Sequence, residues 1–105
     1  MAVLAVMDWE ETKADYDAII AEMGVTGKPA PGIALHVAGS TETGMRIIEL
    51  WDDAAGFESF VTDTLLPTAR AAGIVTTPTY TTIPILNLFA PRLDEVAKLA
   101  AGFAE

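Results

Sequence analysis

Residues 33–51, "IALHVAGSTETGMRIIELW", read as two β-strands joined by a short polar turn. Apolar and β-branched residues fill the predicted strands over 33–39 and 44–51, and the turn falls on "STET", residues 40–43. A hairpin of this length needs further strands or helices to bury one of its faces. The rest of the chain is therefore expected to be arranged around it.

The side chains of this hairpin divide between two faces, because successive residues of a strand point to opposite sides. With a four-residue turn, Gly39 lies opposite Gly44 and His36 lies opposite Ile47. A change of turn length would alter these partners more easily than it would alter the faces. One face is predicted to carry Ala34, His36, Ala38, Met45, Ile47, Glu49 and Trp51, and the other Ile33, Leu35, Val37, Arg46, Ile48 and Leu50.

The segments around the hairpin complete an α+β domain. Before the hairpin, they predict a strand over 2–7, a helix ending at Gly24 and a loop over 25–32. After it, they predict a helix over 52–73 that is broken or kinked at Pro67, and a strand over 76–89. A last helix is predicted from Pro91, with one apolar side formed by Leu93, Val96, Ala97, Ala100 and Phe103. This order, βαββαβ plus a helix, is that of the ferredoxin-like fold. We therefore predict a four-stranded antiparallel sheet in the order 4-1-3-2 with both main helices on one face. Pro84 then falls on an edge strand, where a missing donor is tolerated.

In terms of domains, we expect residues 1–90 to form one domain and residues 91–105 a helical extension. The composition narrows the classes of function. Fifteen acids against six bases give a formal charge of -9, which disfavours binding to nucleic acids and to anionic membranes. One histidine and no cysteine leave no convincing metal-ligand set and no thiolate nucleophile. Neither a membrane span nor a secretory leader is recognisable, so we expect a cytoplasmic location.

The apolar content predicts an assembly. Half of the residues, 51%, are hydrophobic, and the mean hydropathy is +0.37, which is high for a small domain. Both faces of the predicted hairpin are largely apolar, whereas helices can cover only one of them. We therefore predict a symmetric homodimer with sheets packed face to face, and Arg46 in an ion pair between subunits.

The stretch "RIIELWDDAAGFESFVTDTLLPTARAAG" resembles the third strand and second helix of the dimeric α/β barrel superfamily, which includes the antibiotic biosynthesis monooxygenase-like domains. The shared pattern is a strand ending in Glu-x-Trp, then an acid and a helix with aromatic residues, here Glu49, Trp51, Asp52, Phe57 and Phe60. The element order matches over about residues 2–90. The resemblance implies a homodimer with a pocket between each sheet and its own helices.

The resemblance also implies a set of activities, since the superfamily includes cofactor-independent oxygenases of aromatic substrates, heme-degrading enzymes, cyclases and isomerases. Trp51 matches the tryptophan that borders the pocket in the oxygenase and heme-degrading branches. The asparagine of the first strand and the histidine of the second helix in the heme-degrading branch are missing here, and Ile47 stands where the oxygenases often have asparagine. We expect no cofactor.

For the site, His36 and Glu49 are the candidate catalytic residues, with His36 as the general acid or base and Glu49 as its orienting partner. The candidate ligand-binding residues are Trp51, Tyr80, Ile47, Phe57 and Phe60. Three functions stay open: an enzyme acting on a hydrophobic or aromatic metabolite, as a cofactor-independent monooxygenase or a cyclase/isomerase; a non-catalytic binder of a hydrophobic ligand; and a structural homodimer.

Overall fold

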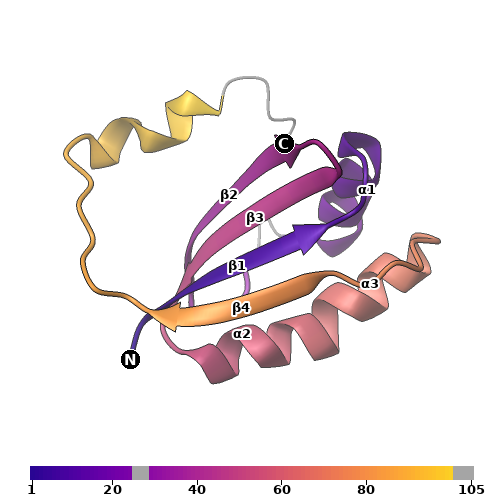
Figure 1. Cartoon of the computed structure of the whole chain (residues 1–105), viewed down its shortest axis with the longest axis horizontal. Helices are drawn as coiled ribbons and strands as arrows, with labels where there is room; N and C mark the ends of the chain where they lie inside the picture. The colour runs from indigo at the N-terminus through magenta and orange to yellow at the C-terminus, as the bar shows by residue number, and fades with distance from the viewer. Residues whose placement is uncertain (25–28, 101–105) are drawn as a thin grey trace.

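The computed structural model describes residues 1–24 and 29–100, which form an antiparallel sheet with helices on one face (Figure 1). The sheet order is β2-β3-β1-β4, which is the predicted order 4-1-3-2 read from the other edge, so the ferredoxin-like fold is confirmed. The elements are β1 (Val3–Trp9), α1 (Lys13–Met23), β2 (Ile33–Thr41), β3 (Gly44–Trp51), α2 (Ala54–Phe60), the π-helical turn η1 (Val61–Leu65), α3 (Leu66–Ala71), β4 (Thr79–Pro84) and the 3-10 helix η2 (Leu93–Leu99).

The ends of α1 follow from local chemistry. Thr12 and Asp15 form a capping box, in which the side chain of each accepts from the backbone N–H of the other. Gly24 takes the left-handed conformation with φ 65° and ends the helix, as predicted. Between these two caps, Tyr16 and Ile19 are the buried residues of the helix.

The helical segment after β3 was predicted to be broken or kinked at Pro67, and it continues past the proline through a π turn. The N–H of Leu66 donates to the carbonyl of Val61, five residues back, so a π turn lies directly before the proline. Proline lacks the N–H for a regular helical bond and its ring crowds the preceding turn, and a wider turn accommodates both defects. Arg70 in α3 then donates to the carbonyls of Ile74 and Thr76, which holds the start of the segment that leads to β4.

The hairpin partners differ from the prediction by two residues. The turn holds only two residues, between Thr41 and Gly44, so His36 lies opposite Glu49 and not opposite Ile47. A shift of two residues keeps every side chain on its predicted face. One residue does change face: an irregularity between Ile33 and Leu35 places Ile33 opposite Trp51, and Ile33 packs against the core.

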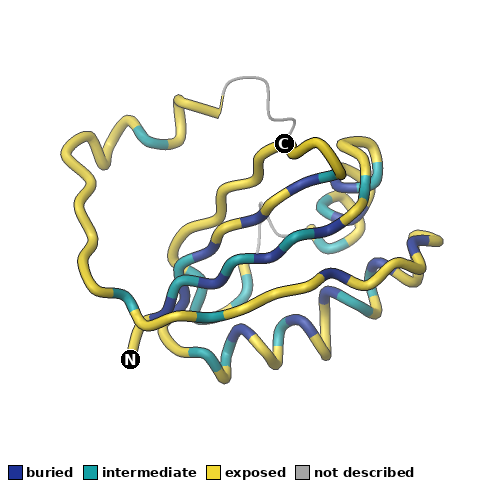
Figure 2. Tube along the Cα trace, viewed as in Figure 1, coloured by how far each residue is buried: buried dark blue, intermediate teal, exposed yellow. Residues whose placement is uncertain are grey.

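The core lies between the inner face of the sheet and the helices. Burial alternates along β1 and β3, as Figure 2 shows. The most deeply buried large side chains are Trp51, Phe57 and Val61. The other buried hydrophobic residues are Val3, Ala5, Met7, Trp9, Tyr16, Ile19, Met45, Ile47, Leu65, Ala69 and Ile74. The centre of the core is therefore formed by β3, which supplies Trp51, together with the helical segment that supplies Phe57 and Val61.

The chain leaves the sheet earlier than predicted. Strand β4 covers Thr79–Pro84 and not the whole of 76–89, and it lies at the sheet edge, where Pro84 was expected. The predicted one-sided helix from Pro91 is wrong in type, because Leu93–Leu99 form a 3-10 helix with no buried residue. Its predicted position Phe103 lies outside the described residues. Figure 1 shows this segment standing away from the sheet.

A first prediction concerns the hairpin turn. A Cβ added at Gly44 would lie 2.3 Å from the carbonyl oxygen of Trp9 and 2.8 Å from Cα of Glu10, both of them backbone atoms that cannot move aside cheaply. Gly44→Ala should therefore lower the free energy of unfolding by about 2 kcal/mol or more. Gly39→Ala, in the same hairpin with nothing within 4 Å of its added Cβ, should change it by about 0.5 kcal/mol at most. Urea unfolding at one protein concentration compares the two, and equal losses would contradict the crowding at Gly44.

Candidate functional site

The two residues predicted to carry the chemistry are brought together by the hairpin. His36 on β2 and Glu49 on β3 are direct cross-strand partners on the inner face. The distance from Nδ1 of His36 to Oε2 of Glu49 is 2.5 Å. The Glu49 side chain is 8% exposed and that of His36 is 31% exposed, so the carboxylate is buried and the imidazole reaches the surface.

A third residue, Tyr16 of α1, completes this contact from the helix layer. Its hydroxyl lies 2.6 Å from Nε2 of His36, and the two rings stack with centroids 5.9 Å apart. Burial raises the pKa of Tyr16 to about 12, with further contributions from the charges of Glu49 and Asp17. At neutral pH the phenol therefore keeps its proton, and it can donate that proton to Nε2.

Trp51 holds the other oxygen of Glu49. Its indole Nε1–H donates to Oε1 of Glu49 over 2.8 Å. The buried carboxylate thus has one partner on each oxygen, as a buried charge requires. We call Tyr16, His36, Glu49 and Trp51 the His36 network.

The remaining predicted ligand-binding residues pack against one another. The ring of Trp51 lies 5.8 Å from that of Phe57 and 5.4 Å from that of Phe60, and Phe57 lies 5.3 Å from Tyr80. Ile47 is buried in the same core. These side chains therefore form one apolar cluster beneath the sheet, with Tyr80 partly exposed at the β4 edge. Whether they also contact a ligand stays a prediction.

The open side of the His36 network lies along the edge strand β2. Ala38 and Ser40 follow His36 on the inner face of β2, and both are exposed. The helix layer packs against the central strands, with α2 in contact with β1 and β3. We call the inner-face positions His36, Ala38 and Ser40 the β2 shelf.

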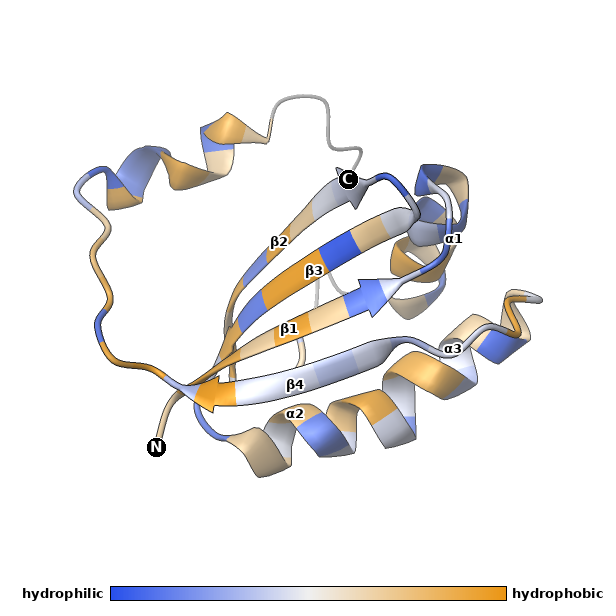
Figure 3. Ribbon diagram, in the orientation of Figure 1, coloured by the Kyte–Doolittle hydropathy of each residue, from blue (hydrophilic) through white to orange (hydrophobic). Residues whose placement is uncertain are grey.

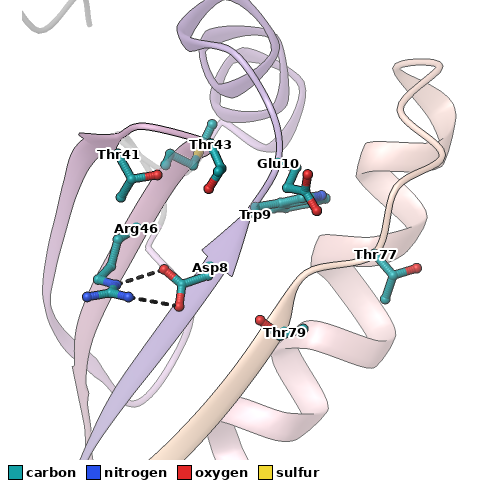
Figure 4. Close-up of a pocket in the computed structure, with 9 residues that line it drawn as sticks. Asp8, Trp9, Glu10, Thr41, Thr43, Arg46, Thr77 and Thr79 are labelled. Atoms are coloured by element: carbon teal, nitrogen blue, oxygen red, sulfur yellow. Dashed lines mark hydrogen bonds and ion pairs between the residues drawn. The ribbon is translucent and has the colours of Figure 1, made fainter.

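A separate cleft of about 390 Å³ lies where β1 ends beside the hairpin turn (Figure 4). Its lining residues are Asp8, Trp9, Glu10, Thr41, Thr43, Met45, Arg46, Thr77 and Thr79, none of which was predicted as a site residue. Within the chain, Nε and Nη2 of Arg46 donate to the two carboxylate oxygens of Asp8. These hydrogen bonds lower the pKa of Asp8. The ion pair of Arg46 between subunits stays a prediction.

Tyr16 is the member of the network that the sequence did not identify. Its spacing with Ile19, Ile20 and Met23 marked it only as a core position of an amphipathic helix. One signal was available: Tyr16 is the only residue of that stripe with a polar tip, and a buried hydroxyl needs a partner. Sequence alone does not show that α1 crosses the sheet beside His36.

Residues 1–24 and 29–100 contain neither a metal-binding cluster nor a membrane-spanning helix. No three histidine or acidic side chains of this part of the chain are grouped so as to hold a metal ion. No helix within it has the length and apolar character needed to cross a bilayer.

Comparison with known proteins places the fold. No family model and no curated sequence matches the chain. Among solved structures, Rv0793 from Mycobacterium tuberculosis has a TM-score of 0.57 at 12% identity and covers 86% of this chain and 100% of its own. SnoaB, a cofactor-independent oxygenase from Streptomyces nogalater, has a TM-score of 0.54 at 16% identity and covers 87% of this chain and 96% of its own.

A dimeric ferredoxin-like protein of unknown function from Jannaschia sp. CCS1 has a TM-score of 0.51 at 14% identity and covers 81% of this chain and 100% of its own. At such identities the likeness establishes the fold and leaves the activity open. The chain has the ferredoxin-like fold that it shares with antibiotic biosynthesis monooxygenase-like proteins, as the sequence resemblance predicted.

Proposed function

We propose that this protein is an enzyme that removes a proton from a small hydrophobic or aromatic molecule, with His36 as the base. The observation that carries the proposal is the contact between His36 Nδ1 and the buried carboxylate of Glu49. A carboxylate held against one ring nitrogen orients the imidazole and stabilises its protonated form, which is the arrangement of an activated base. The Trp51 indole in turn holds the carboxylate in place.

The hydrogen-bond directions define which nitrogen is the base. Because a carboxylate oxygen can only accept, a neutral imidazole paired with Glu49 carries its proton on Nδ1, and the lone pair of Nε2 is left to accept from the Tyr16 phenol. The base is therefore Nε2, and in this structure it is capped by the phenol. A substrate on the β2 shelf would replace that phenol as the hydrogen-bond partner of Nε2.

The chemistry that follows depends on the substrate. Proton removal from an enolisable or phenolic ring leaves an electron-rich anion, which can react with dissolved O₂ or rearrange within the molecule. The first outcome is that of a cofactor-independent monooxygenase and the second that of a cyclase or isomerase. The likeness in fold to SnoaB favours the first. The ligand is proposed to contact the β2 shelf, whereas Tyr80 lies on β4 at the opposite edge of the sheet.

A non-catalytic role is the second candidate, as a binder of a hydrophobic molecule or as a structural homodimer. The observation in its favour is that the polar groups of the His36 network are already hydrogen-bonded within the chain. A structural role would be enough to explain such a network, namely to provide the hydrogen bonds that a buried glutamate needs.

We further propose that the protein is a homodimer in which the outer sheet faces pack together. Leu35, Val37, Ile48 and Ile83 are exposed apolar side chains on that face. Figure 3 shows hydrophobic stretches along β1, β2 and β3. Apolar residues on an uncovered sheet favour a second sheet over water. The dimeric protein from Jannaschia sp. CCS1, which shares the fold, is a precedent.

The catalytic proposal predicts opposite results for two substitutions at one hydrogen bond. With a panel of enolisable polycyclic phenols, His36→Ala should lower kcat/KM by about 100-fold or more, since the base is lost. Tyr16→Phe, which removes the hydroxyl that caps Nε2, should retain at least the wild-type value. Oxygen uptake and mass spectrometry of the products provide the measurement. An active His36→Ala enzyme would exclude His36 as the base. If the wild-type protein shows no turnover but its tryptophan fluorescence is quenched by a ligand, the non-catalytic binding role would be favoured.

The protonation state of Tyr16 can be tested without a substrate. In Tyr80→Phe, Tyr16 is the only tyrosine, and its phenolate absorbance should appear with a midpoint near pH 12, against about 10 in the same variant unfolded in urea. Because the folded-state pKa is the higher one, the unfolded chain loses its proton first as pH rises from 10 to 12. The free energy of unfolding should therefore fall over this window, and by less in Tyr16→Phe. A folded-state midpoint near 10 would contradict the buried, uncharged phenol.

The dimer proposal is tested at Ile48, near the middle of the outer face. Ile48→Lys should raise the dimer dissociation constant by at least about ten-fold, because two ammonium groups would be placed in an apolar interface. Lysine also reduces the net negative charge, so repulsion between acidic subunits cannot explain such a loss. Glu58→Lys, an exposed position of α2 where lysine likewise lowers the negative charge, is the matched control. Sedimentation equilibrium measures both, and a wild-type monomer at about 100 µM would remove the proposal.

A further inference from the structure

We infer that residues 85–100, here called the C-terminal arm, pack against the outer sheet face of a second copy of this chain. The arm carries large apolar side chains at positions where a solvated tail would be polar. Leu86 is fully exposed at 101% and Phe89 is 83% exposed. Leu88, Leu93 and Leu99 are also largely exposed. Isolated exposed leucines are ordinary on a protein surface, whereas a cluster on one short segment indicates an interaction site.

The described part of this chain offers the arm no cover of its own. Its last backbone bond to the sheet is from the N–H of Ile85 to the carbonyl of Ala2, directly after β4 ends. No residue of η2 is buried, and Figure 2 shows the arm exposed along nearly all of its length. The ion pair between Arg92 and Glu95 is internal to the arm. The arm is thus tied to the domain at its base and unpaired beyond it.

The size of the outer face indicates that the occupant is a second copy. Strands of six to nine residues, about 4.8 Å apart with about 3.4 Å per residue, give four strands a flat area of roughly 500 Å². A stable interface buries about 800 Å² on each partner. The accessible surface of such a face exceeds its flat area because the side chains stand out from it, and an apolar arm from each subunit would enlarge the contact beyond the sheet itself.

Charge points to the same partner. Residues 1–84 contain twelve acids and four bases, so two domains repel each other, whereas residues 85–100 contain two of each. The arm therefore adds apolar contact without adding negative charge to an interface between two acidic bodies. Because the arm has no net charge, it suits an acidic twin, whereas it offers a basic partner no complementary charge.

The arm is expected to lie over the edge strand β2 of the other subunit. Val37 is 50% exposed there, and Leu35 beside it is also exposed, so β2 presents the more open part of the apolar outer face. On the opposite edge, β4 leads into the base of the arm itself. The inference rests on the proposed homodimer and adds to it the element that completes its interface.

The energetic test compares substitutions within the full-length chain by sedimentation equilibrium. Replacing Phe89 and Leu93 together by serine should raise the dimer dissociation constant at least about ten-fold, because two large apolar side chains would leave the interface. Asn87→Ser, a polar change in the same arm, should leave the constant unchanged. A wild-type dimer that is insensitive to the double substitution would overturn the arm inference and leave the sheet-to-sheet dimer standing. A wild-type monomer at the same concentration would overturn both.

A second measurement locates the arm directly. The chain has no cysteine, so Asn87→Cys provides a unique site for a nitroxide spin label. Spin-labelled chains at natural isotope abundance are mixed with ¹⁵N-labelled wild-type chains that carry no spin label. Only contacts between subunits can then broaden the observed amide signals. We expect broadening of the amides of Leu35 and Val37 and none at Glu58 of α2. Broadening confined to other surfaces, or none in a confirmed dimer, would overturn the placement on β2.

Discussion

The carboxylate of Glu49 is the constraint on which the inner face of the hairpin depends. A buried charge is tolerated only when its oxygens are hydrogen-bonded, and here the indole of Trp51 and the imidazole of His36 provide the two partners. This requirement favours the register of β2 and β3 in which His36 lies beside Glu49. With the four-residue turn expected from the sequence, His36 would face Ile47, and Glu49 would lose its cross-strand partner. The two-residue turn that the structure adopts places His36 beside Glu49 and leaves the outer face as it was.

The faces of the strands were predictable because their period is fixed by the backbone, whereas the partners were not. Turn length cannot be read from "STET" alone, since all four residues suit a turn of either size. Ile33 reached the inner face through an irregularity that has no mark in the local sequence. Pro67 was expected to break or kink its helix, and the outcome depended on a π turn formed by the residues before it. The segment after β4 was expected to fold as an amphipathic helix, yet no surface of the described chain covers its apolar side.

The candidate site divides in the same way. Alternation along two strands was enough to place His36, Glu49 and Trp51 on one face, whereas the pairing of His36 with Glu49 depended on the two-residue turn. Tyr16 comes from a separate helix, far from Glu49 in sequence, and its position depends on how α1 crosses the sheet. The aromatic residues expected to line a pocket pack on one another, which places the accessible part of the network at the β2 edge. The proposed chemistry is thus expected at a margin of the sheet and not in its centre.

The π turn before α3 also sets the phase of everything that follows it. Each residue of a helix advances the direction of its side chain by roughly 100°, so a turn that holds one additional residue rotates α3 by that angle relative to α2. Without this rotation, Ala69 would turn away from the core and the guanidinium of Arg70 could not reach the carbonyls of Ile74 and Thr76. The extra residue thereby determines where the chain re-enters the sheet. Deleting a single residue from Val61–Leu65 would accordingly disturb the edge strand β4, which would lose its alignment with β1.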